Sequence, residues 1–365
     1  MTQGPVHEVA VEPSAEAWDA VVEANPLGSY LQLDAWARVK AVNGWTSRRL
    51  LDAGPGPVVG AQVLLRRPGP LPWAFAYAPR GPVLEHWDEA SVRRFTELAK
   101  AGLRGPARAS HLRIDPEIEK GAGADDGGAL TAALRDAGWI AAPPIQPVST
   151  RIIDLATDED ALWGDLRKKW RQYVNNARRG GVQIVDAGPE RLDDFYRIYQ
   201  ETAARAGFLI RALSAYRDIW DAYGPSGRAR LLFAELPDGT PAATLFLVRS
   251  GTRVVEPYGG MTAAGADLRA NYLLKWEAIR SSREAGATSY DMWGLAHPGI
   301  AHFKTGFGGR EIGYVGAWDL VLDPLGRKTF QLAQQARVRL ARRRHGLAGG
   351  GTTAAAYTGD GGADG

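Results

Sequence analysis

The chain has 365 residues, 45% of them hydrophobic, which is enough for two cores because one core rarely grows beyond about 250 residues. The absence of cysteine excludes disulfides, thiolate metal sites and a cysteine nucleophile, and no two histidines stand at convincing ligand spacing, so we expect no metal. No run approaches the ~18 apolar residues of a membrane span, and residues 1–13 lack signal-peptide features, so we expect a cytoplasmic protein.

The net charge of +3 hides an uneven distribution of charge along the chain. Residues 163–181 carry six Lys or Arg and one Asp, and residues 325–345 carry seven Lys or Arg and no acidic residue. The rest of the chain is therefore net acidic. Basic patches on an acidic body predict a polyanionic partner, either nucleic acid or an anionic membrane surface. The basic C-terminal segment would suit peripheral contact with the inner face of the plasma membrane.

Periodicity and turn residues divide the first 147 residues into alternating helices and strands. We expect helices at residues 15–24, 89–103 and 130–137, and strands at residues 47–52, 58–65, 74–78 and 111–116. Leu33, Trp36, Ala37 and Lys40 share one face of another helix, because they fall at i, i+3, i+4 and i+7. Lys40 ends this apolar stripe, and a favourable cation at a helix C-terminus would suffice to explain it.

The second half of the chain repeats the plan of the first. The strand, helix and strand at 74–77, 89–103 and 111–115 are matched by a strand, helix and strand at 254–258, 267–284 and 288–291. This internal echo predicts two similar α/β units.

A basic amphipathic helix is predicted between the two units, at residues 163–181. Its apolar face consists of Leu166, Trp170, Val174 and Ala177, at i, i+4, i+8 and i+11. The cations that we select on its flank as candidates for RNA contact are Arg167, Lys168, Arg171 and Arg178. A solvated charged face is the usual explanation of such a pattern, whereas the acidic remainder of the chain favours an RNA-facing surface.

A further helix at residues 191–205 leads to Gly207, Arg211 and Tyr216. The planar fork of arginine suits phosphate or carboxylate. A surface ion pair of Arg211 with Asp218 or Asp221 is the alternative.

The stretch from Tyr290 to Trp318 contains a lysine between two phenylalanines, Phe303-Lys304-Thr305-Gly306-Phe307, followed by two more glycines. A buried ammonium is costly unless it is paired, so such a lysine either faces a cleft or extends past the rings to solvent.

The runs Asp291-Met292-Trp293-Gly294, Gly299-Ile300, Phe303-Lys304 and Phe307-Gly308-Gly309 resemble the closing motif of the FemABX family. Its members transfer an amino acid from aminoacyl-tRNA to the stem peptide of a peptidoglycan precursor. The likeness extends over residues 15–345. The chain lacks a long heptad insertion in its second domain and so resembles the short FemX type, which adds the first residue to the stem peptide. It implies an α/β (α+β) fold of two tandem GNAT-like acyltransferase domains, with the C-terminal helix returning to the first domain.

The resemblance implies domains at 1–147 (acceptor side) and 148–318 (aminoacyl-tRNA side), and a basic C-terminal segment at 319–345 that packs on the first domain. The remaining residues 346–365 are expected to form a disordered Gly/Ala tail. It also implies that Lys40 and the Arg211–Tyr216 stretch bind the precursor's phosphates and that Tyr258 lines the same cleft. Asp115 would lie near the acceptor and orient it.

Transfer from an ester to an amine needs positioning and a cation for the developing oxyanion. We predict that Lys304 is this cation and that Phe303 shapes the pocket for the ester or the terminal adenosine. No residue pattern indicates a covalent intermediate, so direct transfer is expected.

The substrates expected from the resemblance are an aminoacyl-tRNA, with glycine favoured over alanine or serine, and lipid II or UDP-MurNAc-pentapeptide. No cofactor is expected, and we expect a monomer. Two other classes stay open. An acyl-CoA-dependent N-acyltransferase would share the fold, but its pyrophosphate loop is missing before residues 267–284. A non-catalytic RNA or membrane adaptor would explain the basic segments but not Lys304.

Overall fold

The computed structural model describes residues 12–344 except 53, 55, 68, 70, 106, 296 and 297, without the side chains of 334 and 337–344. The predicted tail at 346–365 lies outside this part of the chain. The described residues form two compact units, one of residues 12–148 with 314–344 and one of residues 149–313. The boundaries expected from the sequence lay at 147 and 318, so the chain re-enters the first unit a few residues before the predicted position.

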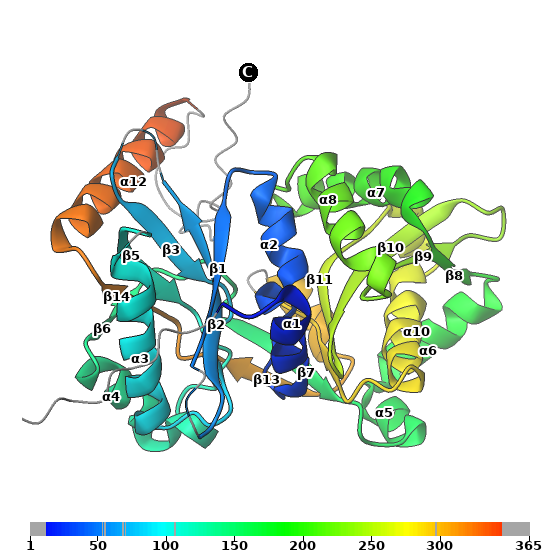
Figure 1. The fold of residues 1–365 in the computed structure, drawn as a ribbon. Coiled ribbons are helices and arrows are strands. Elements are labelled where there is room, and N and C mark those ends of the chain that lie inside the picture. The colour runs from blue at the N-terminus through cyan, green and yellow to red at the C-terminus, as the bar shows by residue number, and fades with distance from the viewer. Residues whose placement is uncertain are drawn as a thin grey trace, which may run out of the picture. The chain divides into compact units, whose positions relative to one another are not determined.

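The first unit is built on a seven-stranded sheet of order β1-β2-β3-β5-β14-β6, with β4 beside β2 (Figure 1). Its strands are β1 (Thr46–Leu51), β2 (Val59–Arg66), β3 (Ala74–Ala78), β4 (Val83–Leu84), β5 (Ala109–Ile114), β6 (Trp139–Ala142) and β14 (Ala317–Val321). Its helices are α1 (Ala15–Ala24), α2 (Asp34–Ala41), α3 (Glu89–Arg104), α4 (Ala129–Asp136) and α12 (Pro324–Arg344), with short 3-10 turns η1 (Tyr30–Gln32) and η2 (Gly123–Gly128).

Side-chain alternation along β3 and β5 separates two layers in the first unit. Ala76 and Leu112 point into the core that α3 covers. Phe75 and His111 point to the other face, where Phe330 of α12 stacks on Phe75 with ring centroids 4.8 Å apart. The C-terminal helix therefore returns to the first unit, as predicted.

The second unit has a seven-stranded sheet of order β13-β7-β12-β11-β10-β9-β8. Its strands are β7 (Ser149–Asp154), β8 (Gln183–Ala187), β9 (Ala229–Glu235), β10 (Pro241–Ser250), β11 (Arg253–Met261), β12 (Ser289–Asp291) and β13 (Arg310–Gly313). Its helices are α5 (Glu159–Asp165), α6 (Lys168–Arg179), α7 (Leu192–Ala206), α8 (Leu213–Tyr223), α9 (Ala263–Asp267), α10 (Ala270–Glu284) and α11 (Pro298–Thr305), with 3-10 turns η3 (Pro189–Arg191) and η4 (Gly224–Ser226).

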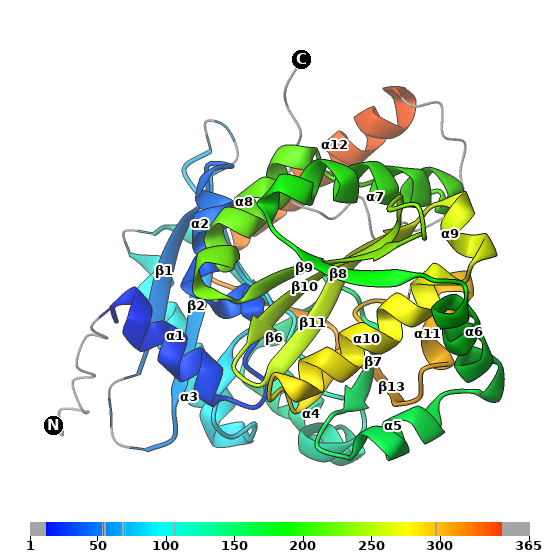
Figure 2. The same cartoon turned by 90° about the vertical axis from the view of Figure 1, so that its right-hand side faces the viewer.

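Helices cover both faces of this second sheet, as Figure 2 shows for α10 and for α7 with α8. Leu245 and Leu247 of β10 join the core beneath α10 and α6. Phe246 points the other way and packs edge to face on Phe195 of α7 and Trp220 of α8. The central strand β10 is therefore buried on both faces, which explains its nearly continuous apolar run.

The predicted internal echo is confirmed. In the first unit β3 and β5 pair in parallel across the connecting helix α3, and in the second unit β11 and β12 pair in parallel across α10. The fold class is therefore the predicted one, with two α/β units of mixed sheets.

Two helix predictions need correction. The helix predicted at 163–181 is two helices, because Leu166 and Arg167 adopt extended backbone angles between α5 and α6. The helix predicted at 267–284 starts only at Ala270, because Arg269 has a left-handed backbone with φ of 60°.

Candidate active site

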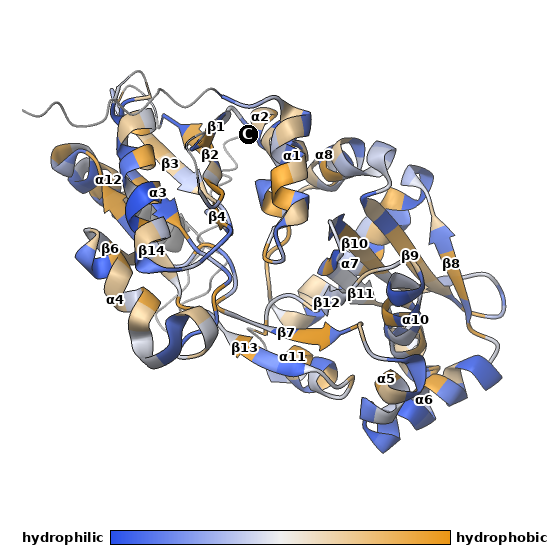
Figure 3. Cartoon of the chain, turned by 60° about the horizontal axis from the view of Figure 1, so that its bottom comes forward, coloured by the Kyte–Doolittle hydropathy of each residue, from blue (hydrophilic) through white to orange (hydrophobic). Residues whose placement is uncertain are grey.

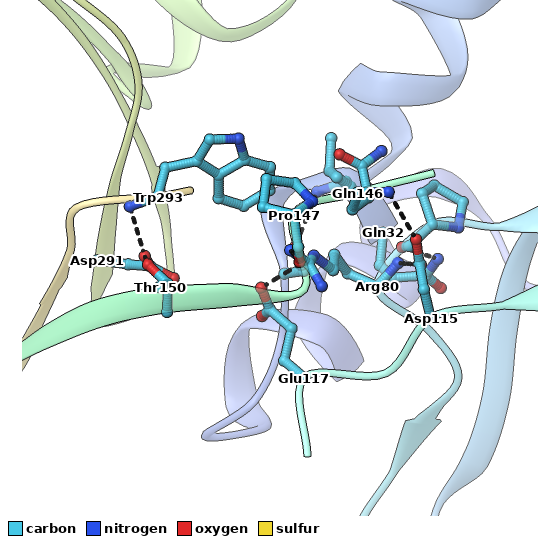
Figure 4. A network of polar contacts seen from close by, with 12 residues as sticks. Gln32, Arg80, Asp115, Glu117, Gln146, Pro147, Thr150, Asp291 and Trp293 are labelled. Carbon is cyan, nitrogen blue, oxygen red and sulfur yellow. Dashed lines mark hydrogen bonds and ion pairs between the residues drawn. The ribbon is translucent and has the colours of Figure 1, made fainter. Parts of the chain in front are cut away.

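Asp115 directly follows β5 and is 3% exposed. Its Oδ1 accepts a hydrogen bond from the Arg80 backbone N–H at 2.7 Å, and its Oδ2 accepts one from the Gln146 backbone N–H at 3.3 Å (Figure 4). Oδ2 also accepts a hydrogen bond from the Tyr77 hydroxyl at 2.7 Å. Burial raises the pKa of Asp115, because loss of solvent outweighs these hydrogen bonds and the charge of Arg80. A carboxylate with a raised pKa is a stronger base than one in water.

Arg80 stands beside this carboxylate, although the sequence analysis did not select it. Its φ of 56° is unusual for a residue other than glycine. Its Nε lies 3.2 Å from Glu117 Oε1, its guanidinium donates to the Pro147 carbonyl at 2.8 Å, and it stacks over the Tyr314 ring. Arg80 and Asp115 line a small recess of the first unit. The Arg-Gly-Pro turn after β3 was the only sequence signal for this position.

Lys40 belongs to the last turn of α2, also in the first unit. Its Nζ lies 5.2 Å from the centre of the Trp36 ring, one turn earlier on the same helix face. The shared face agrees with the predicted stripe, and the phosphate-binding role of Lys40 stays a prediction.

The structure brings three of the predicted acceptor-binding residues together in the second unit. The Arg211 side chain donates a hydrogen bond to the Tyr258 hydroxyl and stacks on Tyr258 and Tyr216, with ring centres 5.7 and 5.8 Å from its central carbon. The Tyr216 hydroxyl accepts the Arg211 backbone N–H at 3.3 Å. Burial, and then the neighbouring Tyr258, raise the pKa of Tyr216, so the Tyr216 phenol beside the Arg211 cation stays neutral.

Lys304 lies in α11, a helix that was not predicted, and it is 9% exposed. Its Nζ donates to three successive backbone carbonyls, those of Met292 at 2.6 Å, Trp293 at 3.0 Å and Gly294 at 2.9 Å. Burial lowers the pKa of Lys304 to about 8. All three protons of the ammonium are directed at protein carbonyls, which differs from the expectation that Lys304 points one at a substrate oxyanion.

Phe303, the predicted pocket residue, is partly buried and packs edge to face on Tyr272 and Phe307, with ring centres 5.1 and 5.2 Å apart. The Phe303 carbonyl accepts a hydrogen bond from the indole N–H of Trp170 at 3.0 Å. The Gly306 carbonyl accepts one from the backbone N–H of Arg167 at 2.9 Å. These two bonds join α11 to the basic helix α6.

A buried ionic cluster lies close to Lys304, and the sequence analysis missed it. Lys275 is paired with Glu256, which also accepts the Tyr290 hydroxyl at 2.6 Å. All three side chains are at most 6% exposed. Lys275 and Glu256 are separated by 19 positions and lie on different elements, so no local pattern could have paired them.

The four predicted RNA-binding cations differ in their surroundings, although the apolar face predicted beneath them is buried. Arg167 and Lys168 are exposed at the start of α6, which is coloured largely hydrophilic in Figure 3. Arg171 donates to the carbonyls of Trp163 and Gly164, and Arg178 pairs with Glu277 at 2.7 Å. Because the helix breaks at Leu166 and Arg167, the carbonyls of Trp163 and Gly164 lie in the last turn of α5, where Arg171 donates hydrogen bonds to them.

The predicted site residues divide between the units: Lys40 and Asp115 belong to the first, and all the others to the second. Within the described residues, no group of three or more metal-ligating side chains is found, and no helix is both long and apolar enough to cross a membrane. Most cations of the C-terminal segment have side chains outside the described set, so the membrane contact stays a prediction.

Comparison with known proteins covers nearly the whole chain. The sequence model of the FemAB family matches residues 14–238 and 237–335. A lipid II:glycine glycyltransferase of Staphylococcus aureus (strain MRSA252) is 24% identical over 402 residues, which is 89% of this chain and 94% of the relative. One from Staphylococcus saprophyticus is 26% identical over 381 residues, covering 84% and 92% of the two chains.

Solved structures agree on the fold. FemX superposes with a TM-score of 0.79 at 22% identity, covering 88% of this chain and 98% of FemX. The C-terminal domain of a putative lysylphosphatidylglycerol synthetase from Agrobacterium fabrum superposes with a TM-score of 0.53 at 16% identity, covering 85% and 92%. The match of the family model to most of the chain shows that this protein belongs to the FemAB family.

Proposed function

We propose that this protein is a tRNA-dependent aminoacyltransferase that adds the first glycine of an interpeptide bridge to the stem peptide of lipid II. The observation that carries the proposal is the near full-length match to relatives named lipid II:glycine glycyltransferase. An aminoacyl ester is already activated, so the enzyme has to hold the ester and the acceptor amine together. Such a reaction agrees with a site that contains no evident nucleophile.

The acceptor's diphosphate is assigned to Arg211. A guanidinium supplies several donors in one plane, and the contacts with Tyr216 and Tyr258 fix the plane of Arg211. Asp115 is assigned to the acceptor amine, because a carboxylate of raised pKa is suited to take the proton that the amine must lose.

The donor tRNA is assigned to α6. Arg167 and Lys168 are exposed cations at its start, and Arg167 lies 5.6 Å from the centre of the buried Trp170 ring. Tyr173 carries Lys169 and Arg269 over its ring, at 5.6 and 4.8 Å from the ring centre. Cations interleaved with aromatic rings suit the unpaired end of an RNA, whose phosphates need charge and whose bases stack.

One assay tests the function directly. The purified protein is incubated with each charged tRNA in turn and with lipid II or UDP-MurNAc-pentapeptide, and the product is weighed by mass spectrometry. We expect a gain of one glycine on lipid II. Transfer from an acyl-CoA, or tRNA binding without any transfer, would replace the proposal with one of the two other classes.

The donor assignment has its own test. Neutralising Arg167 and Lys168 with Gln should weaken tRNA binding and reduce the slope of log affinity against log salt by about 1.5 to 2. The matched control neutralises Arg171 and Arg178, whose guanidinium groups already bind protein carbonyls and Glu277. An equal loss of slope in both double variants would mean that all four cations contact phosphate, and no loss in either would leave a solvated face.

A further inference from the structure

Helix α12 packs on the sheet of the first unit through one face (Figure 1). Gly326 in its first turn is buried, and a side-chain carbon at this position would lie only 2.7 Å from Trp73. Arg327 is paired with Asp319 at 3.1 Å, and the ring of Phe330 is stacked on the sheet. These contacts fix one side of the helix and therefore also fix which residues its other side presents.

The opposite side of α12 is exposed and carries two leucines. Leu325 and Leu332 fall at i and i+7, which places them on one face, and they are 64% and 58% exposed. Lys328, Gln335 and Ala336, at i+3, i+10 and i+11, belong to the same face and are exposed as well. We call these five residues the outer face of α12. Among the described residues, no other helix or strand exposes two large apolar side chains to this extent.

The charge of α12 has one sign. Its sequence contains seven Lys or Arg and no acidic residue, and five of the seven are arginines within residues 337–344. Asp319 neutralises Arg327 in the first turn, whereas Lys328 is exposed on the outer face. A basic helix with leucines on its exposed face is typical of segments that lie in the surface of an anionic membrane.

We propose that the outer face of α12 binds an anionic lipid bilayer, with Leu325 and Leu332 at the boundary between headgroups and acyl chains. RNA is a less suitable partner, because its bases stack on aromatic rings, and the aromatic ring of α12, Phe330, is turned to the sheet. A second copy of the chain is also less suitable, because two such helices would bring like charges together. The surface is argued from α12 alone, whereas its purpose, which is to bring the enzyme to lipid II, rests on the proposed function.

Vesicle binding by the full chain tests the two leucines without any substrate. The double variant Leu325→Gln, Leu332→Gln should bind phosphatidylglycerol-containing vesicles about tenfold more weakly than the wild type, with the same salt dependence, because apolar contact is lost and charge is kept. Both side chains are exposed, so thermal unfolding should not change. Ile140→Gln replaces an exposed apolar residue of β6 in the same unit and is the control. Unchanged binding in the leucine variant, or an equal loss in the control, would overturn the proposal.

The arginines are tested separately, together with the choice between lipid and RNA. Replacing Arg342, Arg343 and Arg344 with Gln should weaken binding to the same vesicles by about 10²-fold and flatten its salt dependence, with little effect on tRNA binding. The matched variant neutralises Arg167 and Lys168 of the second unit and should show the reverse. If the α12 variant loses tRNA binding and keeps vesicle binding, or if the leucine variant abolishes a dimer of the wild type, the proposed partner is wrong.

Glycyl transfer separates this surface from the proposed function. At limiting enzyme, the leucine variant should modify lipid II in anionic vesicles about tenfold more slowly than the wild type, yet modify a water-soluble lipid II analogue with a short prenyl chain at the wild-type rate. An equal loss on both acceptors would mean that the leucines support the fold or the site, and would overturn the proposal. If vesicle binding depends on α12 as expected but the wild type transfers nothing from any charged tRNA, the proposed function fails and the membrane surface stands.

Discussion

The two units place a buried carboxylate at the same point of their repeated topology. Asp115 follows β5 and Asp291 ends β12, and each of these strands comes after a connecting helix and pairs in parallel with an earlier strand. Each carboxylate accepts a backbone N–H from a non-glycine residue of left-handed conformation, Arg80 with φ of 56° and Trp293 with φ of 57°. The two donors come from different places, because Arg80 follows the earlier strand β3 whereas Trp293 follows Asp291 itself, so the echo covers the strands and the carboxylates and not these backbone contacts.

The surroundings of the two carboxylates differ. Asp291 is paired with the guanidinium of Arg253, and both side chains are at most 7% exposed. Asp115 accepts one hydroxyl and two backbone N–H groups, and burial raises its pKa. The same strand–helix–strand arrangement thus holds a fixed ion pair in the second unit and a carboxylate suited to proton transfer in the first. For this reason we propose a role in proton transfer for Asp115 and a structural role for Asp291.

Among the variants that test the difference between the two carboxylates, the largest expected effect is a loss of stability at Asp291. Asp291→Asn should lower the free energy of unfolding of the second unit by about 3–5 kcal/mol, because it breaks the buried ion pair with Arg253. Urea unfolding read by hydrogen exchange in β11 and β12 measures it. The control is Asp186→Asn, which breaks an exposed pair with Arg230 and should cost less than about 1 kcal/mol. Equal costs would remove the distinction drawn between the two carboxylates.

The sequence predicted the elements better than the contacts between them. The helix at 15–24 and the strand at 74–78 have the predicted bounds, because caps, turns and apolar spacing are local signals. The conformation of Trp293 could not be predicted, since a left-handed backbone is usually signalled by glycine. Lys304 stood out as a lysine between aromatics, but its partners are three carbonyls about ten residues earlier, which only the fold brings to it.

The basic helix shows the same limit. The spacing of Leu166, Trp170, Val174 and Ala177 gave the buried face correctly. The cations beside that face looked equivalent in the sequence, yet the structure gives some of them protein partners, because periodicity reports which face is buried and not which acceptors lie nearby.

A smaller effect concerns acid sensitivity, which should distinguish the first unit from the second. Burial lowers the pKa of His111 to about 4, whereas the one described histidine of the second unit, His302, is exposed. Between about pH 6.5 and 4 the unfolded chain binds a proton at His111 that the folded chain does not, so stability falls as pH falls. His111→Phe, which can stack on Phe75 and Phe330, should remove up to about 1.4 kcal/mol per pH unit of this dependence.

Urea unfolding of the first unit at several pH values measures the slope. Asp319 lies near His111. Burial alone would raise the pKa of Asp319, but Arg113, and to a smaller extent the charge of His111, outweigh burial and lower it. Its contribution is therefore lost only below its ordinary pKa of about 3.8, outside the pH range in which His111 acts. Asp115, with a raised pKa, acts in the opposite sense. Replacement of the exposed His86 by Asn is the control, and an unchanged slope in His111→Phe would contradict the assignment.

The smallest effect on stability, paired with a large one on chemistry, is expected at Asp115. Because its folded pKa is raised, the folded state holds its proton more tightly than the unfolded state does, so its contribution to stability is present at low pH and is lost as pH rises through the folded pKa. At neutral pH its charge therefore costs stability, and removing that cost offsets part of the roughly 1–3 kcal/mol that Asp115→Asn loses by leaving a buried donor without an acceptor. The net change in the free energy of unfolding should therefore be smaller than that of Asp291→Asn.

Transfer should respond differently, because an amide cannot take the proton that leaves the acceptor amine. Single-turnover transfer at saturating donor and acceptor should slow by about 10²-fold in Asp115→Asn, and the decline of the wild-type rate toward acid pH should flatten in the variant. Tyr77→Phe removes a hydrogen bond to the same carboxylate but leaves its charge, so it should retain most of the rate. A near-normal rate in Asp115→Asn, with stability unchanged, would make Asp115 the structural counterpart of Asp291 and leave the proton acceptor to be sought elsewhere.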